Sequence, residues 1–344
     1  METFLSIDYP TWWFLVIGGL FSGYAVLDGF DFGAGAWHLF FRKEQSRRIA
    51  LNAVGPVWDG NEVWLVIGGG ALFAGFPVVY ATLFSAMYVP FMLFLAFLIL
   101  RAVSIEFRSK EKMKWWRQMW DIGYSVSSIM LPLMLGVVLG NVLVGFPLEE
   151  GKVLRVSLLQ SIHPFSILTG ATTLALCMMH GAIYLTLKTE GRLFAKISLL
   201  LRRAIITFIL LFGITTVYAL IYLPHLSDLF KSNPAYFLVP LLAILCLANI
   251  PRLANKRHYR KAFIFSSLSI CLFLMIVAME LYPVILYSTL NEAWHITVYD
   301  AASSTKTLKM MLGFAAVGFP LVGVYTWFVY RTFWGKVELD EMSY

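Results

Sequence analysis

Residues 57–75 read VWDGNEVWLVIGGGALFAG, a stretch apolar enough to cross a membrane that nevertheless carries Asp59 and Glu62. Trp58 and Trp64 flank these two acidic residues. A carboxylate in the hydrocarbon region costs several kcal/mol unless it is paired, hydrated or protonated. The stretch therefore predicts a membrane-spanning helix whose acidic residues have a function.

The composition of the whole chain agrees with an integral membrane protein. Of its 344 residues, 59% are hydrophobic and 14% are charged, and the mean hydropathy is +0.75. A soluble domain carries roughly a quarter charged residues. The net charge of +7 does not indicate nucleic-acid binding, because the basic residues follow the membrane topology.

Apolar runs of the length that spans a bilayer, about 20 residues, occur nine times. They lie near 11–40, 50–74, 78–103, 119–146, 161–187, 199–223, 234–251, 262–287 and 309–333. The run 234–251 is the weakest prediction, because Pro240 interrupts it. No basic residue precedes the first run, so we expect this helix to be retained rather than removed as a signal peptide.

The basic residues predict the orientation of these helices, because loops rich in Lys and Arg face the cytoplasm. All but five of the 27 lie in alternate connections, at 41–49, 101–118, 188–203 and 252–261, and in the tail from Arg331. The exceptions are Lys152, Arg155, Lys231, Lys306 and Lys309. This alternation predicts an outside N-terminus, a cytoplasmic C-terminus and one polytopic domain over residues 1–344.

Five acidic residues fall within the predicted spans: Asp28, Asp31, Asp59, Glu62 and Glu280. The first four form two pairs with i,i+3 spacing, which places both members of a pair on one helix face. Each pair lies ten to thirteen residues from the basic loop at 41–49, or roughly 15–20 Å deep. We therefore expect the two pairs to form one cluster, with Glu280 nearer the outer side.

Two interpretations of these groups remain open. Intramembrane carboxyls can be protonated and act only as hydrogen-bond donors between helices. For the four clustered carboxyls we favour proton exchange, because neighbouring carboxyls keep part of their number protonated near neutral pH. His180, at a similar depth, is either a satisfied structural histidine, which we favour, or a proton relay.

The residues that could hold a redox centre or a metal ion are sparse. Cys177, Cys246 and Cys271 lie in apolar runs without CxxC spacing, so we expect free, buried thiols. Haem needs axial ligands such as His. His180 is the only histidine well inside a predicted span, with His163 and His38 near the ends of others. We therefore expect no cofactor and no metal site in this chain.

Glycines surround the acidic pairs. Gly29, Gly33 and Gly35 follow Asp28, and Gly68 to Gly70 follow Glu62. Small residues allow close helix packing in membranes, and we expect that role here. A nucleotide-binding loop is excluded, because no strand precedes these glycines.

Several motifs together make the chain resemble subunit II of the cytochrome bd-type quinol oxidases. They are GFDFGAG (29–35), WDGNEVWL (58–65), RSKEKMKWWRQMWD (108–121), HGAIYLTLKTEG (180–191), YPVILYSTLNEAW (282–294) and YRTFWGKV (330–337). The resemblance runs from the first predicted helix to the tail, and the combination of the first two motifs is highly specific.

The resemblance implies an all-α fold of two four-helix bundles, about 11–146 and 161–287, with a peripheral last helix at about 309–333. It also implies a bacterial cytoplasmic-membrane complex that oxidises quinol and reduces oxygen to water. A larger subunit I would hold two b-type haems and haem d, and small single-helix subunits and a structural quinone can accompany it.

The resemblance gives individual residues a role. Asp59, in the WDGN motif, is implied to lie on a proton path toward the haem d site, and Asp28 and Asp31 match the acidic positions of the first helix. Glu62 stands where some family members have glutamine, so an acid is not required there. The motif residues with an expected packing role are Gly29, Gly33, Trp58, Asn61 and Trp64.

Two other classes of protein fit part of these observations. A proton-coupled secondary transporter also uses mid-membrane carboxyls, but such proteins tend to show repeats and broken helices, and only Pro240 suggests a break. A purely structural membrane scaffold would not need ionisable groups. The leading prediction is a haem-free oxidase subunit that supplies protons and stabilises subunit I.

Overall fold

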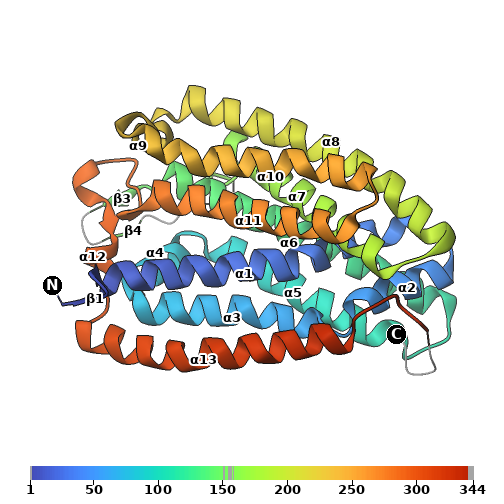
Figure 1. The fold of residues 1–344 in the computed structure, drawn as a ribbon. Helices are drawn as coiled ribbons and strands as arrows, with labels where there is room; N and C mark the ends of the chain where they lie inside the picture. The colour runs from blue at the N-terminus through green and yellow to red at the C-terminus, as the bar shows by residue number, and fades with distance from the viewer. Residues whose placement is uncertain (1, 150–151, 154–156, 158, 340–344) are drawn as a thin grey trace.

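The computed structural model describes residues 2–149, 152–153, 157 and 159–339 and is almost entirely helical (Figure 1). The long helices are α1 (Tyr9–Trp37), α3 (Trp58–Gly75), α5 (Tyr88–Arg108), α6 (Lys114–Val144), α7 (Pro164–Lys188), α8 (Gly191–Tyr222), α10 (Leu238–Asn255), α11 (Tyr259–Leu281) and α13 (Thr305–Thr332). The short helices are α2 (Glu44–Val54), α4 (Pro77–Ala86), α9 (Asp228–Ser232) and α12 (Val298–Ala301).

The described chain also contains four short 3₁₀ helices, His38–Phe40, Pro224–Ser227, Pro234–Phe237 and Glu292–Trp294, and three two-stranded antiparallel pairs. β1 (Thr3–Phe4) pairs with β2 (Ile7–Asp8), and β3 (Leu148–Glu149) pairs with β4 (Lys152–Val153). β5 (Val284–Leu286) pairs with β6 (Ile296–Thr297). In Figure 1 the labelled β1, β3 and β4 lie at the end of the molecule that holds the N-terminus, whereas α2 and the C-terminus lie at the opposite end.

Eight of the described helices are long and apolar enough to cross a membrane by themselves. A ninth crossing is reached if α3 and α4 are counted together, although they are bent by 117° where they meet. The chain is thus a multi-pass, all-helical protein with eight or nine candidate spans. Helix α10 is among the eight. Pro240 does not interrupt it, because this proline lies in the first turn, where a backbone N–H would have no partner within the helix.

The predicted second span, 50–74, is wrong at its start. Residues 50–54 belong to α2, and α3 begins only at Trp58. Pro56 and Val57 separate the two helices, because proline lacks the N–H that would continue the helix and Val57 leaves the helical conformation.

The predicted third span, 78–103, is also two helices. α4 ends at Ala86, Met87 leaves the helical conformation, and α5 begins at Tyr88. Pro90 cannot donate to the carbonyl of residue 86, and its ring would clash there. The eighth span ends at Leu281 rather than 287, and residues 284–286 form β5.

Two predicted loops are mostly helical. α5 continues to Arg108 and α6 starts at Lys114, so little of 101–118 is a connection. Likewise α8 starts at Gly191 and takes up most of 188–203. Long basic side chains at helix ends can reach water beyond the apolar region, so a basic residue does not have to end a helix.

Helix α7 has the central position in the packing. It contacts α1, α6, α8 and α11. Its N-terminus is fixed by a capping box, in which the His163 ring and the Ser166 hydroxyl each bond the other residue's backbone N–H. By contrast, α13 lies at the edge of the molecule (Figure 1), and Leu308 is its one buried residue.

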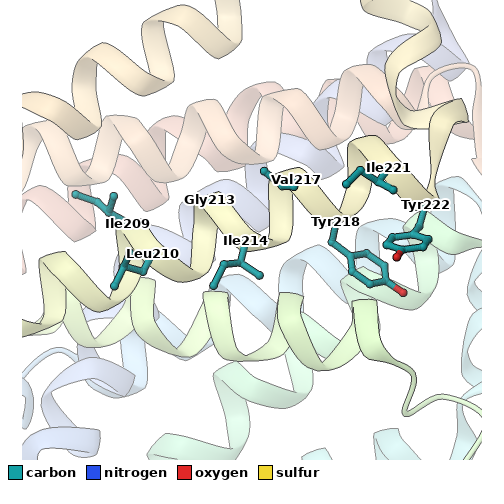
Figure 2. A pocket seen from close by; sticks show the side chains of 8 residues that line it. All are labelled: Ile209, Leu210, Gly213, Ile214, Val217, Tyr218, Ile221 and Tyr222. Carbon is teal, nitrogen blue, oxygen red and sulfur yellow. The ribbon is translucent and has the colours of Figure 1, made fainter.

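The outer face of helix α8 is apolar. A groove of about 490 Å³ runs along it from Ile209 to Tyr222, with an almost wholly apolar lining (Figure 2). Gly213 opens the groove, since a Cβ there would meet no atom within 4 Å. An apolar outer face of this kind is what a helix in contact with lipid requires.

Candidate functional site: a buried carboxyl–arginine cluster

Asp28 and Arg101 form a fully buried ion pair between α1 and α5. Arg101 Nη2 donates to Asp28 Oδ1 over 2.6 Å, and neither side chain is exposed. The guanidinium also lies over the Phe32 ring, 4.6 Å from its centroid. A buried cation is tolerated only with such partners, because an unpaired charge in the interior is strongly unfavourable.

Asp31 joins the same cluster from the next turn of α1. Its Oδ2 accepts from Asn61 Nδ2 at 2.7 Å and lies 3.9 Å from Arg101 Nη2. Asn61 in turn accepts from the Tyr330 hydroxyl of α13 at 2.9 Å. We predicted that the acidic residues of the first helix lie near the WDGN motif. The contact between them is the hydrogen bond from Asn61 to Asp31, although we expected only a packing role for Asn61.

Arg101 is a member of the cluster that the sequence did not reveal. It counts among the basic residues of the predicted connection 101–118, but it lies inside α5 and is 0% exposed. One signal was available: no glycine or proline separates Arg101 from Arg108, so the helix has no reason to end at the first arginine.

Several buried polar atoms around Arg101 have no hydrogen-bond partner within the described part of the chain. They are Asp28 Oδ2, Asp31 Oδ1, Arg101 Nε and Nη1, and the hydroxyls of Tyr24 and Tyr124. Buried polar groups are nearly always hydrogen-bonded, to protein or to ordered water. This grouping therefore marks a polar, water-compatible region inside an otherwise apolar bundle.

Asp59 and Glu62 are less buried than Asp28 and Asp31. Asp59 is exposed in the first turn of α3, and Glu62 is half-buried one turn further in. The depth that we inferred assumed one helix from residue 50, and the break before Trp58 removes that basis. The charges of Arg101, Asp28 and Asp59 nevertheless act on Glu62, so the outer and the buried acidic residues remain electrostatic neighbours.

His180 is fully buried where α7 meets α1 and α11. Its Nε2 donates to the Val26 carbonyl at 3.0 Å, and its Nδ1 lies 2.6 Å from the Ser266 hydroxyl. The ring stacks on Phe263 with centroids 4.7 Å apart. A neutral ring with its proton on Nε2 satisfies both bonds, so the geometry favours the structural interpretation and leaves no nitrogen for a haem iron.

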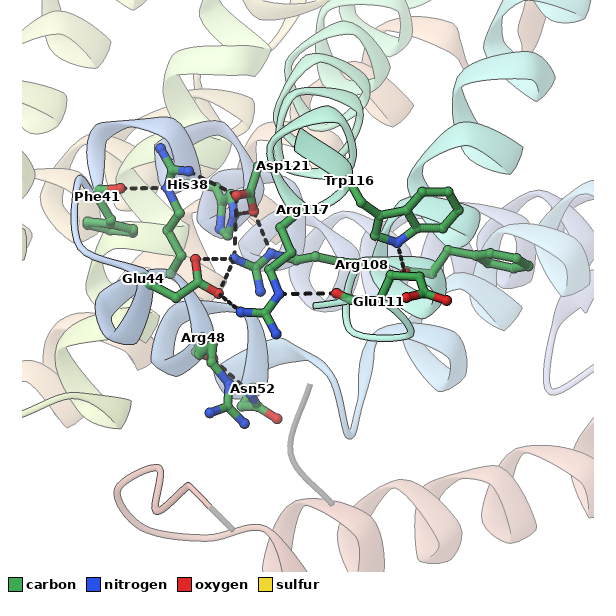
Figure 3. A network of polar contacts seen from close by, with 12 residues as sticks. His38, Phe41, Glu44, Arg48, Asn52, Arg108, Glu111, Trp116, Arg117 and Asp121 are labelled. Atoms are coloured by element: carbon green, nitrogen blue, oxygen red, sulfur yellow. Dashed lines mark hydrogen bonds and ion pairs between the residues drawn. The ribbon is translucent and has the colours of Figure 1, made fainter. Parts of the chain in front are cut away.

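A second polar network, which the sequence did not reveal, lies at the basic end of the molecule, and only part of it is buried (Figure 3). Asp121 of α6 accepts from Arg108 Nε at 2.6 Å and from Arg47 Nη1 at 2.9 Å, and it lies 2.5 Å from His38 Nε2. Arg108 and Arg117 both donate to Glu44. The network thereby joins the end of α1 to α2, α5 and α6.

The glycines differ in how closely they approach their neighbours. A Cβ on Gly33 would lie 1.9 Å from the Cys177 carbonyl, and one on Gly23 would lie 2.6 Å from the Trp64 ring. Gly29 has only an ordinary contact with Cys177 Sγ at 3.7 Å. A Cβ on Gly69 or Gly70 would meet no atom of the described chain within 4 Å, so the packing prediction does not hold for these two within this chain.

The remaining candidates lie apart from the cluster. Glu280 is nearly buried at the C-terminal end of α11, with its Oε1 unpaired among the described residues. Cys177, Cys246 and Cys271 are free thiols. Within the described part of the chain, no three His, Cys, Asp or Glu side chains are grouped so that they could hold a metal ion.

The fold and the cluster define a multi-pass helical membrane protein with a buried, ion-paired carboxyl site. Residues 9–333 match the family model described as cytochrome bd terminal oxidase subunit II, and the chain belongs to this family. Its members act as subunits of a quinol oxidoreductase that serves as a terminal oxidase of the respiratory chain.

Individual relatives agree with the family match. The chain is 31% identical to the cytochrome bd-I ubiquinol oxidase subunit 2 of Escherichia coli K12, covering 98% of both chains. It is also 31% identical to the cytochrome bd ubiquinol oxidase subunit 2 of Bacillus subtilis, covering 93% of this chain and 95% of the relative. A chain of the bd oxidase structure from Geobacillus thermodenitrificans shares the fold, with a TM-score of 0.79, 19% identity and coverage of 94% and 98%.

Proposed function

We propose that this chain is the haem-free subunit II of a bacterial cytoplasmic-membrane quinol oxidase, and that it conducts protons toward a haem-bearing subunit I. The two haems b and the haem d would belong to that partner. The basic end of the molecule, with α2 and the C-terminus, would face the cytoplasm, as the distribution of Lys and Arg favours. The two four-helix bundles, the peripheral α13, the structural quinone and the small accessory subunits are part of the same proposal.

The observation that carries the proton route is a graded series of carboxyls around one arginine. Asp59 is exposed near the basic end, Glu62 is half-buried, and Asp28 and Asp31 are fully buried beside Arg101. One guanidinium balances one carboxylate, so the two buried acids can hold a proton between them without leaving an unpaired charge. Such a pair can accept a proton from the outer carboxyls and release it inward.

The exposed side of α3 supports a partner on this face. Val63, Val66 and Ile67 are exposed on the same helix as Asp59. An ionised carboxylate facing lipid is costly, whereas at a protein interface it can be hydrated or paired. We infer that subunit I covers this face and that Asp59 lies at the edge of the interface, within reach of cytoplasmic water.

The test is oxygen uptake by the co-purified complex carrying Asp59→Asn. The proposal predicts a large loss of quinol-driven oxygen uptake while the haem absorption spectrum stays that of the wild type. Glu111→Gln, at an exposed carboxyl in the connection between α5 and α6, is the matched control and should leave uptake unchanged.

The loss of oxygen uptake in the variant Glu62→Gln provides a second check. Because the amide of Glu62→Gln keeps the polar environment and Asp59 remains, we expect a smaller loss than for Asp59→Asn. Normal turnover in Asp59→Asn with a full haem content would overturn the proton-path proposal and leave a structural role for the chain.

A further inference from the structure

A basic cavity lies at the end of the second half of the molecule. It has a volume of about 410 Å³ and is lined by the ends of α7 and α8, the turn between α10 and α11, and the C-terminal tail. Its cations are Arg257, His258 when protonated, Arg260, Lys261 and Lys336. None of the five forms an ion pair with a carboxylate in the described part of the chain.

The position of these charges on α11 is unfavourable unless an anion is present. Arg260 and Lys261 lie in the first turn of α11, and no side chain caps this helix. The N-terminal end of a helix carries partial positive charge, so cations are disfavoured there and anions are bound. The cavity thus combines a positive helix end with additional positive side chains.

The backbone brings a further charge to the same place. Arg257 has a φ of +58°, in the left-handed region that glycine or asparagine adopts more readily. Strain of this kind at a non-glycine residue is maintained where the surroundings or a function require it. Arg257 lines the cavity two residues before the start of α11.

Lys336 lines the cavity from the C-terminal tail. Its Nζ donates to the carbonyls of Thr186 and Thr189 at 3.1 and 2.9 Å. Burial lowers the pKa of this ammonium, while Glu190 acts in the opposite direction and Arg260 lowers the pKa further. An anion in the cavity would offset the effect of Arg260 on the pKa of Lys336.

The remaining lining indicates what kind of anion fits. Leu187, Phe194 and Tyr259 supply apolar surface next to the cations. Arg260 lies over the Trp334 ring, 5.0 Å from its centroid, and this tryptophan is 67% exposed at the end of the membrane-spanning bundle. Tryptophan is enriched at the headgroup level of a membrane, so the cavity opens where lipid phosphates lie.

We propose that this cavity binds the phosphate headgroup of an anionic phospholipid, with its acyl chains running along the apolar surface below. Clusters of basic residues between membrane helices recognise such headgroups. A zwitterionic lipid would bind less well, because it brings no net negative charge. The proposal depends only on the membrane location of the chain and not on the proton route.

The experiment measures lipid binding to the co-purified complex by native mass spectrometry after delipidation in mild detergent. The probes are tetraoleoyl cardiolipin, dioleoyl phosphatidylglycerol and dioleoyl phosphatidylcholine. We expect the two anionic lipids to bind, and the double variant Arg257→Gln, Lys261→Gln to weaken them by about tenfold or more. The double variant Lys110→Gln, Lys112→Gln removes two exposed charges outside the cavity and should bind as the wild type does.

Two further arms identify the occupant. Inorganic phosphate at millimolar concentration should not displace the lipid, and displacement would indicate a soluble anion and overturn the proposal.

A chain shortened by residues 338–344 tests whether the acidic tail ELDEMSY fills the cavity instead. Lipid binding by the full chain supports the proposal, whereas binding only after truncation, or equal binding in both double variants, refutes it. Oxygen uptake is a separate readout, so this result and that for the proton route remain distinguishable.

Discussion

Arg101 Nη2 lies 2.6 Å from Asp28 Oδ1, and both side chains are completely buried within the helical bundle. The other two nitrogens of this guanidinium, Nε and Nη1, have no partner within the described part of the chain. Among the described residues, the ion pair is therefore the only direct compensation of the arginine's charge apart from the more distant Asp31.

Arg101→Met should destabilise the chain strongly, because it leaves Asp28 buried without a cation. Removing one partner of a buried pair typically costs about 3–5 kcal/mol. Thermal unfolding of the purified complex measures this loss. The double variant Arg101→Met, Asp28→Asn should recover part of it, since no uncompensated charge is left. A double variant no more stable than Arg101→Met would mean that packing of the arginine stem, rather than its charge, dominates.

Asp121 and Glu44 allow a comparison of a buried and an exposed carboxyl in the same network. Asp121 is 1% exposed and holds His38, Arg47 and Arg108, so Asp121→Asn should cost about 3 kcal/mol and loosen α2. The Glu44 side chain is 45% exposed, so Glu44→Gln should cost at most about 1 kcal/mol. Unfolding midpoints and proteolysis between residues 41 and 57 report both effects. Equal losses for the two variants would contradict the importance of burial.

Gly33 should tolerate no side chain, because α1 and α7 are in backbone contact there. A Cβ would lie 1.9 Å from the Cys177 carbonyl and 2.9 Å from Gly181 Cα, so Gly33→Ala must push the helices apart. Gly19 lies on the same helix with nothing within 4 Å of its Cβ position, so Gly19→Ala should be neutral or stabilising by about 0.5–1 kcal/mol. The yield and melting temperature of the assembled complex distinguish the two variants. Similar behaviour of both would argue against the close helix crossing.

Hydrophobic periodicity and charge in the sequence predict the long helices of this fold, whereas the breaks between helices depend on contacts in three dimensions. The apolar runs predicted the long helices, whereas the orientation read from the basic connections stays a prediction. They could not predict the breaks at Gly55-Pro56 and Met87, because an apolar run looks continuous whether or not its backbone turns. Pro56 and Pro90 were the local signals for these two breaks.

The candidate site was likewise predictable only in part. Asp28 and Asp31 lie in one cluster, as the i,i+3 spacing predicted, whereas Asp59 is exposed in the first turn of α3. Arg101 was hidden because the positive-inside rule assigns arginines to loops by default. Which arginine instead pairs with a buried acid depends on the helix neighbours, and a single sequence does not contain that information.

His180 offers the sharpest test of a relay against a structural role, because both of its ring nitrogens are already engaged. His180→Phe keeps most of the ring volume and its stacking on Phe263, while Ser266 can still donate to the Phe263 carbonyl. We expect a loss of about 1–3 kcal/mol from the missing hydrogen bonds and unchanged oxygen uptake per haem in the complex that assembles. Ser266→Ala is the matched control, since it removes one of the two bonds but no ionisable group. A collapse of uptake in His180→Phe, with full haem content and normal uptake in Ser266→Ala, would establish the histidine as a proton relay after all.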